Sequence, residues 1–212
     1  MSYSHFIFDL DGTLSDPLEG MADALNHALI SHGYPAQDTM DFARYVGPPL
    51  EGTLASLTGR DDQEHIASLV AAYRDRYLES GFAQNSVYPG IKNLLEELSL
   101  SGQRLAVCTS KPPATARKIL SLFQLDHYFD FISGGDIGVT KGDQLQHLLE
   151  SDAIDGQALM IGDRDVDLIA AHRNNLVAAG VLWGYGSRLE LSEHNPAHIV
   201  EQPAGIVELS DA

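Results

Sequence analysis

Cysteine and basic residues are scarce in this chain of 212 residues, which holds one Cys and 13 Lys+Arg against 30 Asp+Glu. The single cysteine, Cys108, excludes an intramolecular disulfide, and its place in the apolar run 105–108 predicts a buried side chain rather than a catalytic thiol. The formal net charge of −17 repels polyanions, so we expect neither a nucleic-acid partner nor an anionic membrane surface. A phosphate-bearing ligand would have to be bound by a local group of donors.

Long apolar runs are missing as well. Residues 1–13 lack a basic stretch, and their apolar run is too short for a signal peptide or a membrane span, so we expect a cytoplasmic protein. With 44% hydrophobic and 20% charged residues, the composition is that of a globular domain. The length allows one α/β core and a smaller lobe, and both a monomer and a homodimer stay open.

The order of the patterns predicts an α/β fold with an insertion. Residues 5–10 form a short aromatic and β-branched strand that ends in a turn. Apolar residues then recur at helical spacing, and beyond Pro89 helices and strands alternate, which is typical of a parallel sheet. We therefore predict a Rossmann-like parallel sheet flanked by helices, formed by residues 1–15 and 86–212, with a small all-helical cap at 16–85. The strands after the cap are expected at 105–109, near 129–132, at 158–161 and at 177–181.

Polar residues follow the predicted strands at the positions where open α/β sheets bind ligands. Asp9 and Asp11 flank Leu10 at the end of the first strand, and Gly12 lets the chain turn sharply behind them. Thr109, Ser110 and Lys111 follow a later strand and offer a hydroxyl, turn amides and an ammonium group for a phosphate.

Two further positions complete this pattern. Lys141 lies beside a glycine, and residues 162–167 place Asp163 and Asp167 directly behind a strand. Clustered carboxylates are costly without a cation, and oxygen ligands favour Mg²⁺ or Ca²⁺ over Zn²⁺. Each position also has a purely structural interpretation, as a turn, a helix cap or a solvated lysine. Their joint occurrence in this order favours a catalytic site over these structural interpretations.

The ordered motifs resemble those of the haloacid dehalogenase-like hydrolase superfamily. The resemblance spans essentially the whole chain, and the helical insertion is similar to the cap of the phosphoglycolate phosphatase-like branch. Within that branch, four segments resemble a subgroup of phosphoglycolate phosphatases and 5′-nucleotidases, namely 46–50, 109–112, 162–164 and 182–186.

The resemblance implies a role for each motif residue. It makes Asp9 the nucleophile that forms a phospho-aspartate, and Asp11 the general acid and base. Mg²⁺ would be held by Asp9, the backbone carbonyl of Asp11, Asp163 and, directly or through water, Asp167. Thr109 and the amides near Leu10 and Ser110 would bind the phosphoryl group. Lys141 would neutralise Asp9 and the charge that develops during transfer. Arg44 is the expected contact from the cap to a substrate carboxylate or base.

The implied activity is the magnesium-dependent hydrolysis of a small phosphomonoester, phosphoglycolate or a nucleoside 5′-monophosphate. A dehalogenase of the same fold would lack the second aspartate, so Asp11 argues against that activity. A sugar-phosphate phosphomutase shares every core motif and stays open. A non-catalytic phosphate-binding protein would be expected to lack one of the charged core positions, all of which are present here.

Overall fold

The computed structural model describes residues 3–135 and 138–210. The chain divides into two compact units, which we call the core unit (Met1–Asp16 and Val87–Ala212) and the helical unit (Pro17–Ser86). The chain leaves the core unit through β2 (Ser15–Asp16) and returns through β3 (Ser86–Val87), and these two short strands pair with each other.

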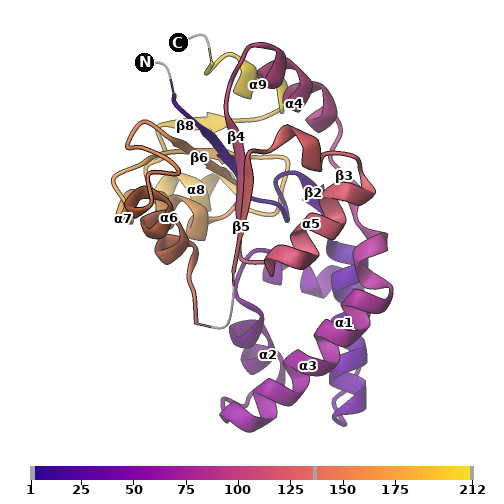
Figure 1. Cartoon of the computed structure of the whole chain (residues 1–212). Coiled ribbons are helices and arrows are strands. Elements are labelled where there is room, and N and C mark those ends of the chain that lie inside the picture. Colours follow the sequence, from indigo (N-terminus) through magenta and orange to yellow (C-terminus); the bar gives the residue numbers. More distant parts are fainter. Residues whose placement is uncertain (1–2, 136–137, 211–212) are drawn as a thin grey trace. The chain divides into compact units, whose positions relative to one another are not determined.

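The core unit is built on a six-stranded sheet with the order β5-β4-β1-β6-β7-β8 (Figure 1). Each neighbouring pair is parallel, which confirms the predicted α/β class. The chain moves outward from β1 in one direction and later in the other, so the strand order reverses at β1, and ligands bind at such switch points. The strands are β1 (Phe6–Phe8), β4 (Leu105–Thr109), β5 (Phe131–Gly134), β6 (Leu159–Gly162), β7 (Val177–Val181) and β8 (His198–Val200).

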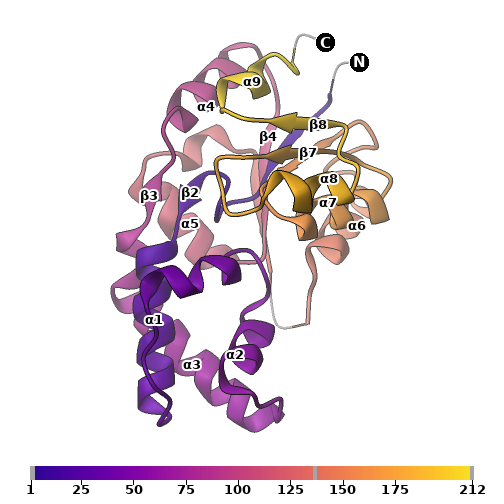
Figure 2. The ribbon, with the colours of Figure 1, turned by 180° about the vertical axis from the view of Figure 1, so that it is seen from behind.

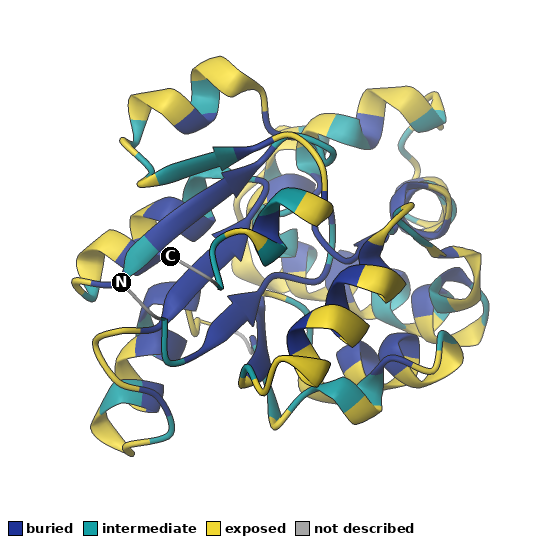
Figure 3. Cartoon of the chain, turned by 90° about the horizontal axis from the view of Figure 1, so that it is seen from above, coloured by how far each residue is buried: buried dark blue, intermediate teal, exposed yellow. Residues whose placement is uncertain are grey.

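Helices cover both faces of this sheet, because its strands are apolar on both sides. On one face Ile7, Ala106 and Met160 pack with Leu145 and Leu168 in a buried core beneath α6 and α7. The central strands β1, β4 and β6 are buried, and the outer faces of the helices are exposed (Figure 3). The helices of the core unit are α4 (Ile91–Leu100), α5 (Pro113–Leu122), η3 (Asp126–Tyr128), α6 (Lys141–Glu150), α7 (Asp165–Arg173), α8 (Arg188–Glu193) and α9 (Ala204–Val207).

The helical unit packs its longer helices by their apolar stripes. Leu25 and Ala28 of α1, and Leu69 and Tyr73 of α3, recur at helical spacing and are buried. An ion pair with 2.8 Å between Arg76 Nε and an Asp23 oxygen also joins α1 to α3. The elements are α1 (Leu18–Ser31), η1 (Thr39–Tyr45), α2 (Leu50–Thr58), α3 (Gln63–Glu79) and η2 (Gly81–Gln84).

One strand is shifted from the sequence-based expectation. The 3₁₀ turn η3 ends at Tyr128 and the strand runs over 131–134 instead of near 129–132. The tail contributes β8 beyond α8, and β8 pairs with β7 as an edge strand of the sheet (Figure 2). Only three residues long and half-buried, β8 has too little apolar alternation to be predicted. Among the helices of the described residues, none combines the length and apolar character that a membrane crossing requires.

Candidate active site

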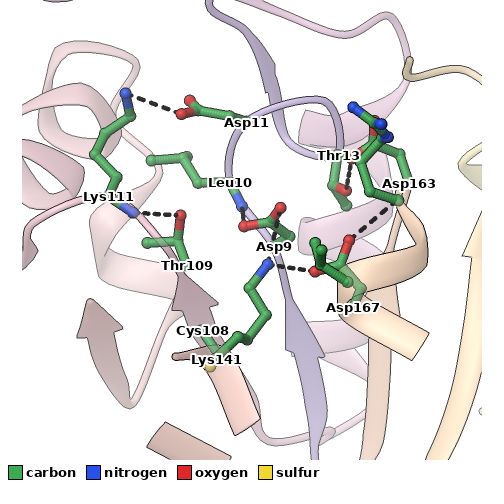
Figure 4. Close-up of polar contacts among 12 residues, drawn as sticks. Asp9, Leu10, Asp11, Thr13, Cys108, Thr109, Lys111, Lys141, Asp163 and Asp167 are labelled. Atoms are coloured by element: carbon green, nitrogen blue, oxygen red, sulfur yellow. Dashed lines mark hydrogen bonds and ion pairs between the residues drawn. The ribbon is translucent and has the colours of Figure 1, made fainter. Parts of the chain in front are cut away.

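Three neighbouring strands bring the polar motifs together at their carboxyl ends (Figure 4). Asp9 follows β1 directly, Thr109 is the last residue of β4, and Asp163 follows β6 directly. All three side chains are buried. Motifs that are up to 154 residues apart in the numbering, from Asp9 to Asp163, therefore share one sheet edge.

The turn after β1 sets the orientation of Asp9. Its Oδ1 accepts the backbone N–H of Leu10 at 2.7 Å, and the Leu10 carbonyl accepts the amides of Leu14 and Ser15 at 2.9 and 3.0 Å. Gly12 has φ +87°, and a Cβ built on it would lie 2.3 Å from Asp163 Oδ2. A glycine is thus required both for the backbone conformation and for the close approach of the Asp163 carboxylate.

Lys141 lies between two carboxylates. It is the first residue of α6, and the preceding Thr140 forms a capping box with Asp143 that starts this helix. Its Nζ is 3.1 Å from Asp9 Oδ2 and also forms an ion pair with Asp167. Burial alone would lower the pKa of Lys141, but the carboxylates of Asp167 and Asp9 outweigh it and raise the pKa. The ammonium group therefore stays charged.

Three buried carboxyl groups form a candidate cation site. Asp9, Asp163 and Asp167 each offer an oxygen, and these oxygens lie within 4.8 Å of one another. Burial, followed by the negative charges of Asp167 and Asp9, raises the pKa of Asp163 to about 8. Burial likewise raises the pKa of Asp167, against the opposing effect of Lys141. Oxygen-only ligands with excess negative charge suit a hard divalent cation, and these residues fit Mg²⁺.

Asp11 makes an ion pair that the sequence-based roles did not include. Its Oδ2 is 2.9 Å from Lys111 Nζ, and its carboxyl group points toward Lys111 rather than toward Asp9 (Figure 4). The other oxygen, Oδ1, is buried and has no hydrogen-bond partner. Burial raises the pKa of Asp11, and Lys111 opposes that shift. Asp11 must therefore rotate before it can act on a group bound beside Asp9.

The end of β4 is supported from α6. Gln144 is buried, donates from Nε2 to the Thr109 carbonyl at 3.0 Å and accepts from the Ser133 hydroxyl at 2.7 Å. Thr109 Oγ1 accepts the backbone N–H of Lys111 at 3.2 Å, and the Ser110 side chain is exposed. Cys108 is buried as predicted, and burial raises the pKa of its thiol to about 12, so it is not a thiolate near neutral pH.

The loop at 182–186, which follows β7, contacts this candidate site, and the sequence analysis assigned it no role there. Its Tyr185 amide donates to Asp163 Oδ2 at 2.8 Å, and Trp183 Nε1 donates to the Thr13 carbonyl at 2.9 Å. Thr13 itself donates to Asp163 Oδ1 at 3.3 Å. The signal for this loop in the sequence is the Gly-x-Gly spacing at 184–186.

Arg44 belongs to η1 of the helical unit, whereas the residues described above belong to the core unit. Its side chain is exposed, and its guanidinium carbon lies 5.0 Å from the centre of the Tyr45 ring. A contact between Arg44 and a substrate stays a prediction.

Buried carboxylates beside an ammonium group and a hydroxyl, at the switch point of a parallel sheet, define a class of α/β enzymes suited to phosphoryl chemistry. Residues 6–181 match the family model of haloacid dehalogenase-like hydrolases, and the chain belongs to this family. It is an enzyme of that family, and its relatives support the class of phosphoric monoester hydrolases.

The relatives carry three different names. A 5′-nucleotidase of Pseudomonas aeruginosa is 38% identical over 93% of this chain and 91% of its own length. The tyrosine-protein kinase PtkA of Mycobacterium tuberculosis is also 38% identical, over 97% of this chain and 71% of its own. A phosphoglycolate phosphatase of Aquifex aeolicus is 32% identical over 97% and 95%.

The fold is matched by a solved structure as well. The crystal structure of a predicted phosphatase from Clostridium acetobutylicum superposes with a TM-score of 0.93 at 35% sequence identity, covering 98% of both chains. This likeness confirms the Rossmann-like fold with its flanking helices.

Proposed function

We propose that this enzyme is a magnesium-dependent phosphatase that hydrolyses a small phosphomonoester, phosphoglycolate or a nucleoside 5′-monophosphate, through a phospho-aspartate on Asp9. The observation that carries the proposal is the buried Asp9 carboxylate, which is 3.1 Å from Lys141 and grouped with Asp163 and Asp167. A carboxylate that lies beside an ammonium group, at the carboxyl end of a central strand, is suited to nucleophilic attack on an anionic ester.

The proposed Mg²⁺ ligands are the carboxylates of Asp9 and Asp163 and the backbone carbonyl of Asp11, with Asp167 supporting them directly or through water. The ion would supply positive charge against which the nucleophile and the phosphate, both anionic, approach each other. Asp163 supports this assignment, because its hydrogen bonds come from the neutral donors Thr13 and Tyr185 while burial makes its charge costly.

The chain's own residues carry the two proposed steps. An Asp9 oxygen attacks phosphorus and the P–O ester bond breaks, while the Asp11 carboxyl group gives its proton to the leaving alkoxide. Water then attacks the phosphorus of the aspartyl phosphate, Asp11 takes a proton from that water, and inorganic phosphate leaves with Asp9 restored. Asp11 has to turn away from Lys111 for both steps.

The remaining roles are those of binding groups. The Thr109 hydroxyl and the amides near Leu10 and Ser110 are proposed to hold the phosphoryl oxygens, and Lys141 to stabilise the charge that develops there. The helical insertion, predicted at 16–85, is proposed to act as a cap that excludes water and selects the leaving group, with Arg44 as its contact.

Two other activities share these core residues and are outcomes of the same test. A sugar-phosphate phosphomutase would use the same nucleophile but pass the phosphoryl group back to a sugar. Transfer to an acceptor other than water is a relevant alternative, because one relative of this chain is named a tyrosine-protein kinase. A non-catalytic phosphate-binding protein would turn over no ester.

The test measures phosphate release from 2-phosphoglycolate, nucleoside 5′-monophosphates, sugar phosphates and an aryl phosphate. Each assay is run with Mg²⁺ and with EDTA, using the wild type and Asp9→Asn. We expect release that requires Mg²⁺ and is lost in Asp9→Asn, since the amide is a poor nucleophile, and the best substrate names the substrate class. Release by Asp9→Asn near the wild-type rate, or undiminished release in EDTA, would refute the mechanism. Interconversion of sugar phosphates with little free phosphate would indicate the mutase instead.

A further inference from the structure

The loop at 182–186, which we call the β7 loop, is bonded both to the carboxylate group and to the segment through which the chain leaves the core unit. One residue makes both connections. The backbone N–H of Tyr185 donates to Asp163 Oδ2 at 2.8 Å, and its hydroxyl donates to Asp16 Oδ1. Asp16 is the last residue of the core unit before the helical unit begins.

The β7 loop is also connected to Asp163 through Thr13. Trp183 Nε1 donates to the Thr13 carbonyl at 2.9 Å, and the Thr13 hydroxyl donates to Asp163 Oδ1 at 3.3 Å. Both carboxylate oxygens of Asp163 therefore accept hydrogen bonds, one from Tyr185, which is itself bonded to Asp16, and one from Thr13, which lies three residues before Asp16. The returning chain is tied in as well, because the Tyr88 amide donates to the Leu14 carbonyl at 3.2 Å.

The β7 loop has little room to move independently of Asp163. A Cβ on Gly184 would lie 2.2 Å from the Gly12 carbonyl oxygen, and a Cβ on Gly186 would lie 1.8 Å from the Asp163 carbonyl oxygen. Backbone packed this closely moves with its neighbours, because interiors at this density transmit strain. A displacement at Asp16 would therefore reach Asp163 through Tyr185.

The Tyr185 hydroxyl donates to a carboxylate oxygen rather than to a neutral acceptor. A hydrogen bond to a carboxylate is about twice as strong as one between neutral groups. This bond has no role in the chemistry proposed above.

We propose that Tyr185 is a positioning residue that couples the occupancy of the cation site to the conformation of the crossing segments, residues 13–16 and 87–88. The inference rests on the proposed function only in taking Asp163 as a ligand of Mg²⁺. A cation that fixes Asp163 fixes the Tyr185 amide, and the Tyr185 ring then holds Asp16. Because coupling is reciprocal, an altered crossing segment also changes the affinity for the cation.

The first measurement is Mg²⁺ affinity by calorimetry, without substrate, on the wild type and on Tyr185→Phe, which loses only the hydroxyl. We expect Tyr185→Phe to bind Mg²⁺ about five-fold more weakly, at the lower end of typical coupling energies. Asp16→Ala should weaken binding similarly, and the double variant should lose no more than either single variant. Asp16→Asn keeps an acceptor for the hydroxyl and should recover most of the affinity.

The second measurement is hydrogen exchange of the crossing segments with and without Mg²⁺. We expect Mg²⁺ to protect them in the wild type and to protect them less in Tyr185→Phe. Tyr34→Phe is the matched control, since its hydroxyl lies 2.8 Å from His65 Nε2 within the helical unit. It should bind Mg²⁺ like the wild type.

Unchanged Mg²⁺ affinity and unchanged protection in Tyr185→Phe would overturn the coupling. Additive losses in the double variant would also overturn it, because independent sites add. A wild type that binds Mg²⁺ yet hydrolyses no ester would refute the proposed function alone, and the calorimetric comparison would still decide the coupling.

Discussion

Replacing Lys141 by methionine tests the electrostatics on which the site depends. Methionine keeps a long apolar side chain at the buried start of α6 but removes the ammonium group between Asp9 and Asp167. Two carboxylates that are almost wholly inaccessible to water then lose a counter-charge. We expect the metal-free protein to lose stability and the enzyme to lose most of its turnover.

The size of the effect follows from burial. Removing one partner of a buried ion pair costs about 3–5 kcal/mol, because the other charge is left uncompensated. Here a carboxyl group can take up a proton instead of staying ionised, which limits the cost, so we expect about 3 kcal/mol at neutral pH. The loss should be smaller at pH 5, where protonation is easier. Turnover should fall about 10²- to 10³-fold, as when one stabilising donor is removed from an active site.

Urea unfolding in EDTA measures this loss. The chain has one tryptophan, Trp183, whose half-buried indole reports on the core unit by fluorescence. The free energy of unfolding is obtained by linear extrapolation for the wild type and Lys141→Met, with and without saturating Mg²⁺. The cation supplies positive charge to the same carboxylates, so the gap between the two proteins should narrow when it is present.

Lys92→Met on the exposed face of α4 is the control for loss of a lysine charge, and it should stay within about 0.5 kcal/mol of the wild type. A metal-free loss below about 1 kcal/mol for Lys141→Met would refute the reasoning, since that is the range of an exposed ion pair. A gap that widens with Mg²⁺ would contradict the placement of the cation beside these carboxylates.

Two predictions concern the neighbouring carboxyl groups. The folded-state pKa of Asp163, raised to about 8, lies above that of an unfolded carboxyl group, so the metal-free folded state binds this proton more tightly and its stability falls as pH rises toward 8. The free energy of unfolding in EDTA should fall more steeply with pH in the wild type than in Asp163→Asn, and parallel curves would contradict this. Lys111→Met removes the charge that opposes the raised pKa of Asp11, so the limb of the pH–rate profile that Asp11 sets should move to higher pH. If this limb of the pH–rate profile does not move, Lys111 does not influence the protonation of Asp11 during turnover.

The sequence by itself was sufficient for the alternation of helix and strand, because apolar periodicity is a local property of the chain. The runs at 91–100, 105–109 and 177–181 coincide with α4, β4 and β7. The motif residues could also be named, since Asp9, Thr109 and Asp163 each stand at the end of an apolar run. Parallel strands carry their carboxyl ends to one edge, so their proximity followed from the pattern.

The resemblance implied that Lys141 neutralises Asp9, but only the tertiary structure decided the other charge pairs. That Lys111 pairs with Asp11, while Lys141 lies between Asp9 and Asp167, depends on where β4 and α6 place each side chain. No periodicity encodes such pairs, because they join residues distant in sequence.

The same holds for the β7 loop and for β8. The contact of Tyr185 with Asp163 and Asp16 exists because Gly184 and Gly186 allow backbone to pack against backbone, which a one-dimensional pattern does not display. The sequence determined the elements and the chemical groups through local periodicity and composition. The packing of strand ends and loops determined their partners, because ion pairs and hydrogen bonds depend on distances in space rather than along the chain.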